Sequence, residues 1–326
     1  MTRKNIFLTL PALIILIVTQ IARSQDIWAD KSPHKSGFVT VNNIKLHYLD
    51  WGGKGEAILF LAGASNSAHI FDDIAPKFTY RFRVLALTRR GHGQSDKPET
   101  GYDTPTLVED IRQFLDQLHI KRINIAGHSL AGDEMTLFAS SYPERVGKLI
   151  YFDAAYERAQ LSSDAFAKEP FPLPPPTKED TASFAAYREW WKRSRGFWSD
   201  AVEADLRETS LASDGTIKPS LSHKIGQAIF KGTVESRPDY TKVKAPALAF
   251  YAIFNLPPWI PPDKEARQKG QEFLDNVDLP YQRKNIEKFK GEMKKGRVIE
   301  MDSNHYLFIT NQDEVIREMR KFLRKR

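Results

Sequence analysis

The ten residues Ile123-Asn124-Ile125-Ala126-Gly127-His128-Ser129-Leu130-Ala131-Gly132 decide the fold of this chain. An apolar run that is typical of a buried strand leads into a serine with small residues on both sides, and an apolar helical pattern follows at 130–141. Small neighbours permit a sharp turn, which exposes the Ser129 hydroxyl at the end of the strand and beside the positive end of the next helix. The stretch therefore predicts a strand–turn–helix unit with Ser129 as a candidate nucleophile.

Strand-like and helix-like runs alternate along the rest of the chain from Gly37 onward. Continuous apolar runs indicate strands buried on both faces, and their alternation with helices predicts an α/β fold with a mostly parallel sheet. The turn Asn42-Asn43 indicates an antiparallel hairpin at the start of the sheet. We expect strands at 38–41, 44–48, 57–61, 83–87, 123–126, 149–152, 248–251 and 298–301, and helices at 106–118, 130–141 and 314–324.

This alternation stops between Tyr156 and about Tyr240. The interval contains a cluster of prolines at 170–176 and a helical pattern that carries three tryptophans. An insertion of this size between two strands predicts a helical cap over the active site, and a surface subdomain without a substrate role is the alternative. The predicted organisation is a signal peptide at 1–24, a first core part at 25–155, a cap at 156–240 and a second core part at 241–326.

The N-terminal segment has the pattern of a signal peptide. Two basic residues precede an apolar run at 6–21, and the small residues Ala22 and Ser24 fit a signal peptidase site that would leave Gln25 first. We therefore expect a secreted or periplasmic protein with no stable membrane insertion after processing. The alternative is an uncleaved N-terminal membrane anchor.

Composition excludes several classes of function. The chain has no cysteine, which excludes disulfides, thiolate catalysis and cysteine-ligated zinc. The formal net charge of +7 lies partly in the N-terminal segment and is otherwise diffuse, so we expect no nucleic-acid partner. The sequence contains no phosphate-binding loop and no dinucleotide fingerprint, and it implies neither a metal nor an organic cofactor.

The unit around Ser129 resembles the nucleophile elbow of the α/β-hydrolase superfamily, and the resemblance extends over nearly the whole chain from Gly37. The usual glycine two residues after the serine is Ala131 here, with Gly132 following it. The resemblance implies an eight-stranded, mostly parallel sheet with helices on both faces and an inserted helical cap. It also implies an oxyanion hole formed by the backbone N–H groups of Ala64 and Leu130, since the segment 59–64 matches the strand end that supplies half of that site.

By the same resemblance, the catalytic base lies on a loop after the last strand. The run 298–301 supplies the strand, and of the eight histidines only His305 lies in the loop that follows it. His92, in the glycine-rich turn at 89–96, matches an architectural segment of the family. His128, beside the nucleophile, is expected to pack under the turn.

The acid of the triad is less clearly marked. The position where the family usually has aspartate is Asn255 here, and an amide cannot supply the negative charge. Some members place the acid one strand earlier, where Asp153 ends the run 149–152, and we favour Asp153. Asp263 is the alternative acid, and Glu134 is a weaker candidate.

These residues predict a serine hydrolase that cleaves a carboxylic ester or lactone through an acyl-enzyme. A serine nucleophile disfavours epoxide hydrolase and haloalkane dehalogenase roles, which use an aspartate on a similar fold. Amide cleavage, carbon–carbon bond hydrolysis and a non-catalytic binding role on the same scaffold remain alternatives. The aromatic, proline-rich cap suggests an apolar or aromatic acyl compound as substrate.

Overall fold

The computed structural model describes residues 28–253 and 255–324. It divides into a unit that ends at Lys31 and a unit that begins at Ser32, and the fold described below is that of the second unit. The predicted signal peptide lies outside the described residues. Within the described ranges, no helix has both the length and the apolar composition needed to cross a membrane.

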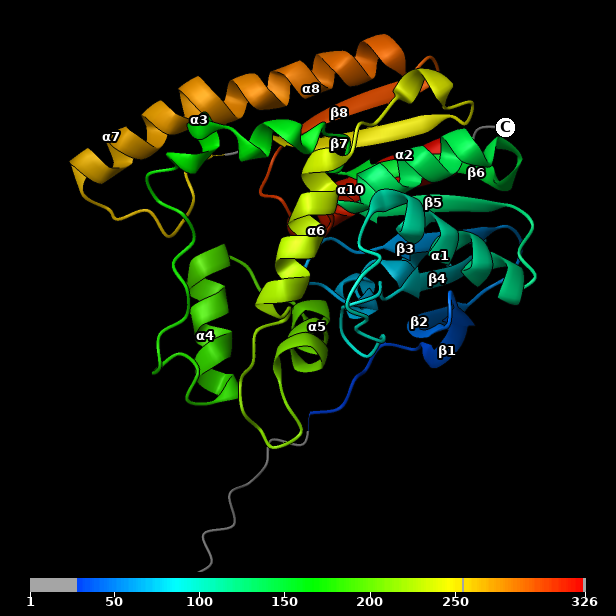
Figure 1. Cartoon of the computed structure of the whole chain (residues 1–326), viewed down its shortest axis with the longest axis horizontal. Helices are drawn as coiled ribbons and strands as arrows, with labels where there is room; N and C mark the ends of the chain where they lie inside the picture. Colours follow the sequence, from blue (N-terminus) through cyan, green and yellow to red (C-terminus); the bar gives the residue numbers. More distant parts are fainter. Residues whose placement is uncertain (1–27, 254, 325–326) are drawn as a thin grey trace, which may run out of the picture. The chain divides into compact units, whose positions relative to one another are not determined.

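The sheet contains eight strands among the described residues, in the order β1-β2-β4-β3-β5-β6-β7-β8 (Figure 1). Strand β2 pairs antiparallel with β1 and β4, and the other neighbours pair in parallel. The predicted eight-stranded, mostly parallel sheet is therefore confirmed. The strands are β1 Lys35–Val41, β2 Ile44–Gly52, β3 Ala57–Leu61, β4 Arg83–Leu87, β5 Ile123–His128, β6 Val146–Phe152, β7 Ala247–Ile253 and β8 Gly296–Asp302.

The opening hairpin follows from its turn residues. Asn42 and Asn43 have φ values of +46° and +62°. A two-residue turn with both residues in the left-handed region matches the twist of the flanking strands, and asparagine tolerates this conformation better than most residues. The turn thus fixes the register in which Val41 pairs with Ile44.

Helices cover both faces of the sheet because the strand residues alternate between two apolar clusters. On β3, Leu59 belongs to the cluster that contains Phe114 of α1 and Phe289 of α8. Its neighbour Phe60 belongs to the cluster that contains Met319 of α10. The helices are α1 Thr104–Gln117, α2 Ala131–Ser141, α3 Asp164–Ala167, α4 Phe184–Arg195, α5 Asp200–Ser210, α6 His223–Glu235, α7 Lys264–Phe273, α8 Leu279–Glu292, α9 Leu307–Thr310 and α10 Gln312–Arg324.

Helices α3 to α6 lie between β6 and β7, in the interval where a cap was expected. Serine side chains accept a hydrogen bond from the first turn of three of these helices and so fix where each begins: Ser183 for α4, Ser199 for α5 and Ser222 for α6. Tyr187 and Trp190 of α4 belong to the same apolar cluster as Phe60 of the sheet. The boundaries of the predicted domains stay a prediction.

The carboxyl ends of the central strands carry the candidate residues. Strand β3 lies between β4 and β5, so the strand order reverses beside β3. Ligands of open α/β sheets bind at the carboxyl ends of the strands near such a reversal.

Short helical turns complete the connections between the strands and helices: η1 Ala68–Phe71, η2 Ala75–Phe78, η3 Pro143–Arg145, η4 Arg158–Ser162, η5 Tyr240–Lys242 and η6 Leu274–Asp278.

Candidate active site

Ser129 occupies the turn between β5 and α2. Its φ is +55°, a left-handed conformation that non-glycine residues adopt only where their surroundings impose it. The surroundings here are tight, since the Ser129 N–H donates to the carbonyl of Phe152 at 3.2 Å. A Cβ atom on Gly132 would lie 1.9 Å from the carbonyl oxygen of Ala154. The close approach that requires glycine therefore falls at Gly132, which explains why position 131 can be alanine.

The loop after β3 passes beside the turn that carries Ser129. A Cβ atom on Gly63 would lie 2.8 Å from Nδ1 of His128 and 3.0 Å from Cβ of Ser129, so the backbone next to Ala64 passes directly beside the serine. Within the part of the chain that the structure describes, neither Ala64 nor Leu130 donates its backbone N–H to another protein group. The assignment of these two N–H groups as an oxyanion hole stays a prediction.

Asp153 and His305 form a close pair. Nδ1 of His305 lies 2.6 Å from Oδ2 of Asp153, and the aspartate side chain is 1% exposed while that of the histidine is 39% exposed. The other carboxylate oxygen, Oδ1, accepts the hydroxyl of Tyr156 at 2.6 Å and the backbone N–H of Ala252 at 3.1 Å. Burial raises the pKa of Tyr156 well above its usual value, so its hydroxyl stays a donor. Three donors therefore hold the carboxylate in one orientation.

The sheet register places this pair beside the serine. His128 of β5 is paired with Phe152 of β6, so Ser129 and Asp153 are the next residues of two adjacent parallel strands. Asp153 also has a positive φ, +45°, and its N–H donates to Phe250 of β7 at 2.8 Å. Ser129, Asp153 and His305 all border one pocket. Among the described residues no hydrogen bond joins the Ser129 hydroxyl to the His305 ring, and such bonds commonly tighten only when substrate is present.

The other positions considered for the triad acid, Asp263 and Asn255, make different contacts from Asp153. Asp263 is the residue that precedes α7, and its carboxylate accepts the N–H of Ala266 at 2.8 Å as a helix cap. Asn255 borders the pocket, where its amide donates to the carboxylate of Asp302. Of the acids considered from the sequence, Asp153 is the one that the structure places against His305.

Glu134 supports the loop after β3 indirectly. It forms a buried ion pair with Arg89 at 2.7 Å, and Arg89 donates to the carbonyls of Ala62 at 2.8 Å and Gly63 at 3.3 Å. Burial raises the pKa of Glu134, and the opposing charge of Arg89 partly offsets this effect. The pair fixes the backbone that precedes Ala64.

Arg158, which the sequence did not single out, supports the turn from the other side. Its guanidinium donates to the carbonyl of Ser129 at 2.6 Å and to that of Ala154 at 3.1 Å. Its charge is matched by the buried carboxylate of Asp133 at 2.8 Å. The sequence signal was weak, because an arginine just after a strand is common on protein surfaces and here its partners are backbone carbonyls.

Two further histidines, His128 and His92, are buried and form hydrogen bonds to backbone carbonyls. His128 is 1% exposed, and its Nε2 lies 2.9 Å from the carbonyl oxygen of His305. Burial lowers the pKa of His128 well below its usual value, so the neutral ring donates this bond. His92 is fully buried, its Nδ1 lies 2.9 Å from the carbonyl of Arg90, and burial lowers its pKa to about 3. Both rings stay neutral and hold backbone segments in place.

The pocket has a volume of about 780 Å³. Ser129, Asp153 and His305 border it together with residues of the cap and of the segment after β7. Apolar side chains supply much of the wall: Leu161, Phe166, Phe171, Phe197, Leu256, Trp259, Ile260 and Phe273. The pocket thus brings the partly buried Ser129 and the 39%-exposed imidazole of His305 next to a largely apolar wall.

Comparisons with known proteins agree with this architecture. The chain is similar to an uncharacterised protein of Mycobacterium tuberculosis (34% identity over 125 residues, 38% of this chain and 36% of that protein). It is also similar to the 2-(acetamidomethylene)succinate hydrolase of Mesorhizobium japonicum (33% over 101 residues, 31% of this chain and 36% of that protein). The chain thus covers little more than a third of the length of these relatives.

A crystal structure of E-2-(acetamidomethylene)succinate hydrolase superimposes with a TM-score of 0.66 at 20% identity, covering 90% of this chain and 100% of that one. At this identity the likeness concerns the fold. The family model described as alpha/beta hydrolase fold matches residues 56–225, which is more than half of the chain. On the strength of this match, and of the sheet and turn described above, the chain belongs to the α/β-hydrolase fold family.

Proposed function

We propose that this protein is a secreted serine hydrolase that cleaves a carboxylic ester or a lactone. The observation that carries the proposal is the convergence of Ser129, at its strained turn, and the Asp153–His305 pair on one pocket. A buried carboxylate at Nδ1 of His305 favours the tautomer in which Nε2 carries a lone pair. That nitrogen is then the base.

In the first step the Ser129 oxygen attacks the acyl carbon, and Nε2 of His305 takes the hydroxyl proton. The negative charge moves to the carbonyl oxygen, which the N–H groups of Ala64 and Leu130 would receive. One such donor is worth roughly 3–4 kcal/mol of barrier. The imidazolium then gives its proton to the leaving alkoxide, and an ester of Ser129 remains.

In the second step a water molecule attacks this acyl-enzyme. His305 takes a proton from the water, the oxyanion forms again at the same donors, and collapse returns the proton to the Ser129 oxygen. The products are a carboxylic acid and an alcohol, which are one molecule when the substrate is a lactone. The imidazolium forms twice in the cycle, and each time the negative charge of Asp153 stabilises it.

The walls of the pocket support an apolar or aromatic acyl compound of small-molecule size as substrate. Its volume of about 780 Å³ lies within the range of ligand sites, and aromatic side chains such as Phe171 and Trp259 border it. The signal-peptide pattern of the N-terminal segment supports secretion or a periplasmic location, and a chain that begins at Gln25 in the culture medium or periplasm would test this.

A fluorophosphonate probe tests the proposal directly, because it reacts with activated serines. The folded wild-type chain should be labelled on Ser129, the Ser129→Ala variant should not be labelled, and Ser303→Ala should be labelled as the wild type is, since Ser303 borders the same pocket without lying at the turn. Absence of labelling in the folded wild type would instead support a non-catalytic binding protein.

A substrate panel then separates the possible reactions. Turnover of nitrophenyl esters and lactones above the Ser129→Ala blank, with slow or no turnover of aminoacyl amides, is the expected result. Preference for the amides would point to an amidase or peptidase, and turnover confined to carbon–carbon bonds beside a carbonyl would point to a carbon–carbon bond hydrolase.

A further inference from the structure

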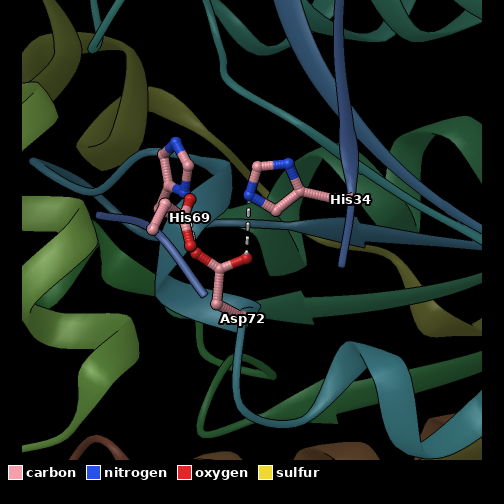
Figure 2. Close-up of side chains that lie close together, drawn as sticks. His34, His69 and Asp72 are labelled. Carbon is pink, nitrogen blue, oxygen red and sulfur yellow. Dashed lines mark hydrogen bonds and ion pairs between the residues drawn. The ribbon is translucent and has the colours of Figure 1, made fainter. Parts of the chain in front are cut away.

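Three side chains away from the active site gather around one point (Figure 2). His34 immediately precedes β1, His69 lies in η1, and Asp72 ends η1. Nδ1 of His69 is 2.7 Å from Oδ2 of Asp72, and Nε2 of His34 is 3.5 Å from Oδ1 of the same carboxylate. We call these residues the histidine–aspartate cluster. None of them borders the pocket that contains Ser129.

The donor set and its spacing match a zinc site. Two imidazole nitrogens and one carboxylate are ligands that Zn²⁺ binds at about 2.0–2.2 Å, and ligands in tetrahedral array at that length lie roughly 3.3 Å apart. The His34–Asp72 separation of 3.5 Å agrees with this spacing. The His69–Asp72 separation of 2.7 Å is to the other carboxylate oxygen, Oδ2, and would have to open by about half an ångström when the ion binds.

Glu208 of α5 orients one of the imidazoles. Nε2 of His69 lies 3.1 Å from Oε2 of Glu208, so a proton on Nε2 directs the lone pair of Nδ1 towards Asp72. Glu208 is itself held, because its carboxylate accepts the N–H of Gln94 at 3.0 Å and the Gln94 amide at 3.2 Å. A carboxylate that receives the second N–H of a histidine is the usual support of a metal-binding imidazole.

The buried carboxylates of Asp72 and Glu208 favour the binding of a cation at the histidine–aspartate cluster. The side chains of Asp72 and Glu208 are 3% and 4% exposed, and both contact imidazoles: Asp72 contacts His34 and His69, and Glu208 contacts His47 and His69. Buried carboxylates need a matching positive charge, and imidazoles supply it only when protonated. A divalent ion at this point would add positive charge beside both carboxylates.

We propose that His34, His69 and Asp72 bind one Zn²⁺ ion in a structural site, with Glu208 holding the His69 ring. The ion joins the segment before β1 to η1 and, through Glu208, joins both to helix α5 of the cap region. The site is independent of the proposed hydrolase reaction, and its test does not use activity.

The full-length chain, freed of metal with a chelator, is titrated with Zn²⁺ in competition with a chromophoric chelator, and its metal content is measured after dialysis. We expect one zinc per chain, a rise in Tm with Zn²⁺, and, with Co²⁺ as a probe, the strong visible absorption of a tetrahedral ion. His34→Gln and Asp72→Asn should each weaken Zn²⁺ binding by at least about 100-fold, and Glu208→Gln by about 10- to 100-fold.

His223→Gln is the matched control, because His223 is exposed at the start of α6 and belongs to no such cluster within 28–253 and 255–324. It should bind zinc as the wild type does. Absence of stoichiometric zinc binding by the wild type would overturn the proposal, whether or not the variants fold. Equal binding by the wild type, His34→Gln and Asp72→Asn would also overturn it and would identify the ion as adventitious.

Discussion

Nδ1 of His305 lies 2.6 Å from Oδ2 of Asp153, a buried carboxylate that follows β6. The segment after β7, which carries Asn255, therefore does not have to supply the acid. The end of β6 reaches the same histidine because β6 lies between β7 and β5, the strand that Ser129 follows. In the proposed reaction, the charge that stabilises an imidazolium at His305 would thus come from the residue that follows β6.

Replacing this carboxylate should cost far more activity than replacing the alternative acid. Asp153→Asn keeps the shape of the side chain but removes the charge and favours the wrong histidine tautomer, so kcat for a nitrophenyl ester should fall by roughly ten-thousand-fold. Asp263→Asn should change kcat less than about threefold, because Asp263 caps α7 and an asparagine caps a helix equally well. Steady-state kinetics of the two variants decide the assignment, and the reverse ranking would transfer the role to Asp263.

Gly63 should be essential for a steric reason. In Gly63→Ala the new Cβ would lie 2.8 Å from His128 and 3.0 Å from Ser129, which would displace the loop that carries the Ala64 N–H. Loss of one oxyanion donor lowers kcat by roughly 10²- to 10³-fold. Gly226→Ala is the control, since nothing lies within 4 Å of its Cβ position in α6. That variant should keep full activity and gain up to about 1 kcal/mol of stability. Equal activity of the two variants would show that the loop does not serve the reaction.

Asp205 of α5 should make stability depend on pH. It is fully buried, and burial together with the charge of Glu208 raises its pKa from 3.8 to about 7, while hydrogen bonds from Asn66 and Ser67 oppose the rise. Between pH 4 and pH 7 the folded state therefore holds a proton that the unfolded state has lost. The free energy of unfolding contributed by this group is greatest at low pH and falls as the pH rises towards 7.

Urea unfolding of the wild type and of Asp205→Asn at pH 5 and pH 7.5 measures this effect. The stability of the wild type relative to the variant should fall by roughly 2 kcal/mol over that range, at about 1.4 kcal/mol per pH unit where only the folded state is protonated. Tyr187 and Tyr306 also lie near Asp205, but neither titrates in this window, since burial raises the pKa of each. A difference that is constant or grows with pH would contradict the assignment.

The sequence predicted the parts of the molecule that local pattern determines. The apolar strand, the small residues and the helical pattern around Ser129 specify the turn, because each is a local property of the backbone. The eight strands and the hairpin at Asn42-Asn43 were predicted for the same reason, and the structure confirms them. The choice between Asp153 and Asp263 needed the spatial order of β6 and β7, which no short pattern encodes.

The supporting network could not be predicted, because it consists of long-range contacts to backbone atoms. Arg89 and Arg158 hold the two loops beside Ser129 through carbonyl oxygens, which every residue has and no sequence pattern marks. For a related reason, the sequence did not predict the histidine–aspartate cluster. His34 and His69 are separated along the chain, their shared partner is Asp72, and Glu208, which contacts His69, belongs to the cap region.

Arg195, at the end of α4, should contribute to substrate selection in the proposed hydrolase. It borders the pocket, its guanidinium lies 5.1 Å from the ring centre of Trp191, and among the described residues it forms no ion pair. A half-buried guanidinium without a carboxylate partner in the protein favours a substrate that itself carries a carboxylate. The carboxylates of Glu169 and Asp278 also border the pocket, and burial raises the pKa of Asp278 to about 6, so its repulsion of an anionic substrate is weaker in mild acid.

Two para-nitrophenyl esters test this role, a neutral butyrate and a monoester of succinate that keeps one free carboxylate. Arg195→Gln should raise KM for the succinate monoester by about tenfold or more, the value of one charge-assisted hydrogen bond, while KM for the butyrate changes less than about twofold. Arg193→Gln is the matched control, since Arg193 lies in the same helix but is exposed and paired with Asp180. An equal change for both esters would mean that Arg195 shapes the pocket without recognising charge, because lost packing acts on either substrate whereas a lost ion pair acts on the anion alone.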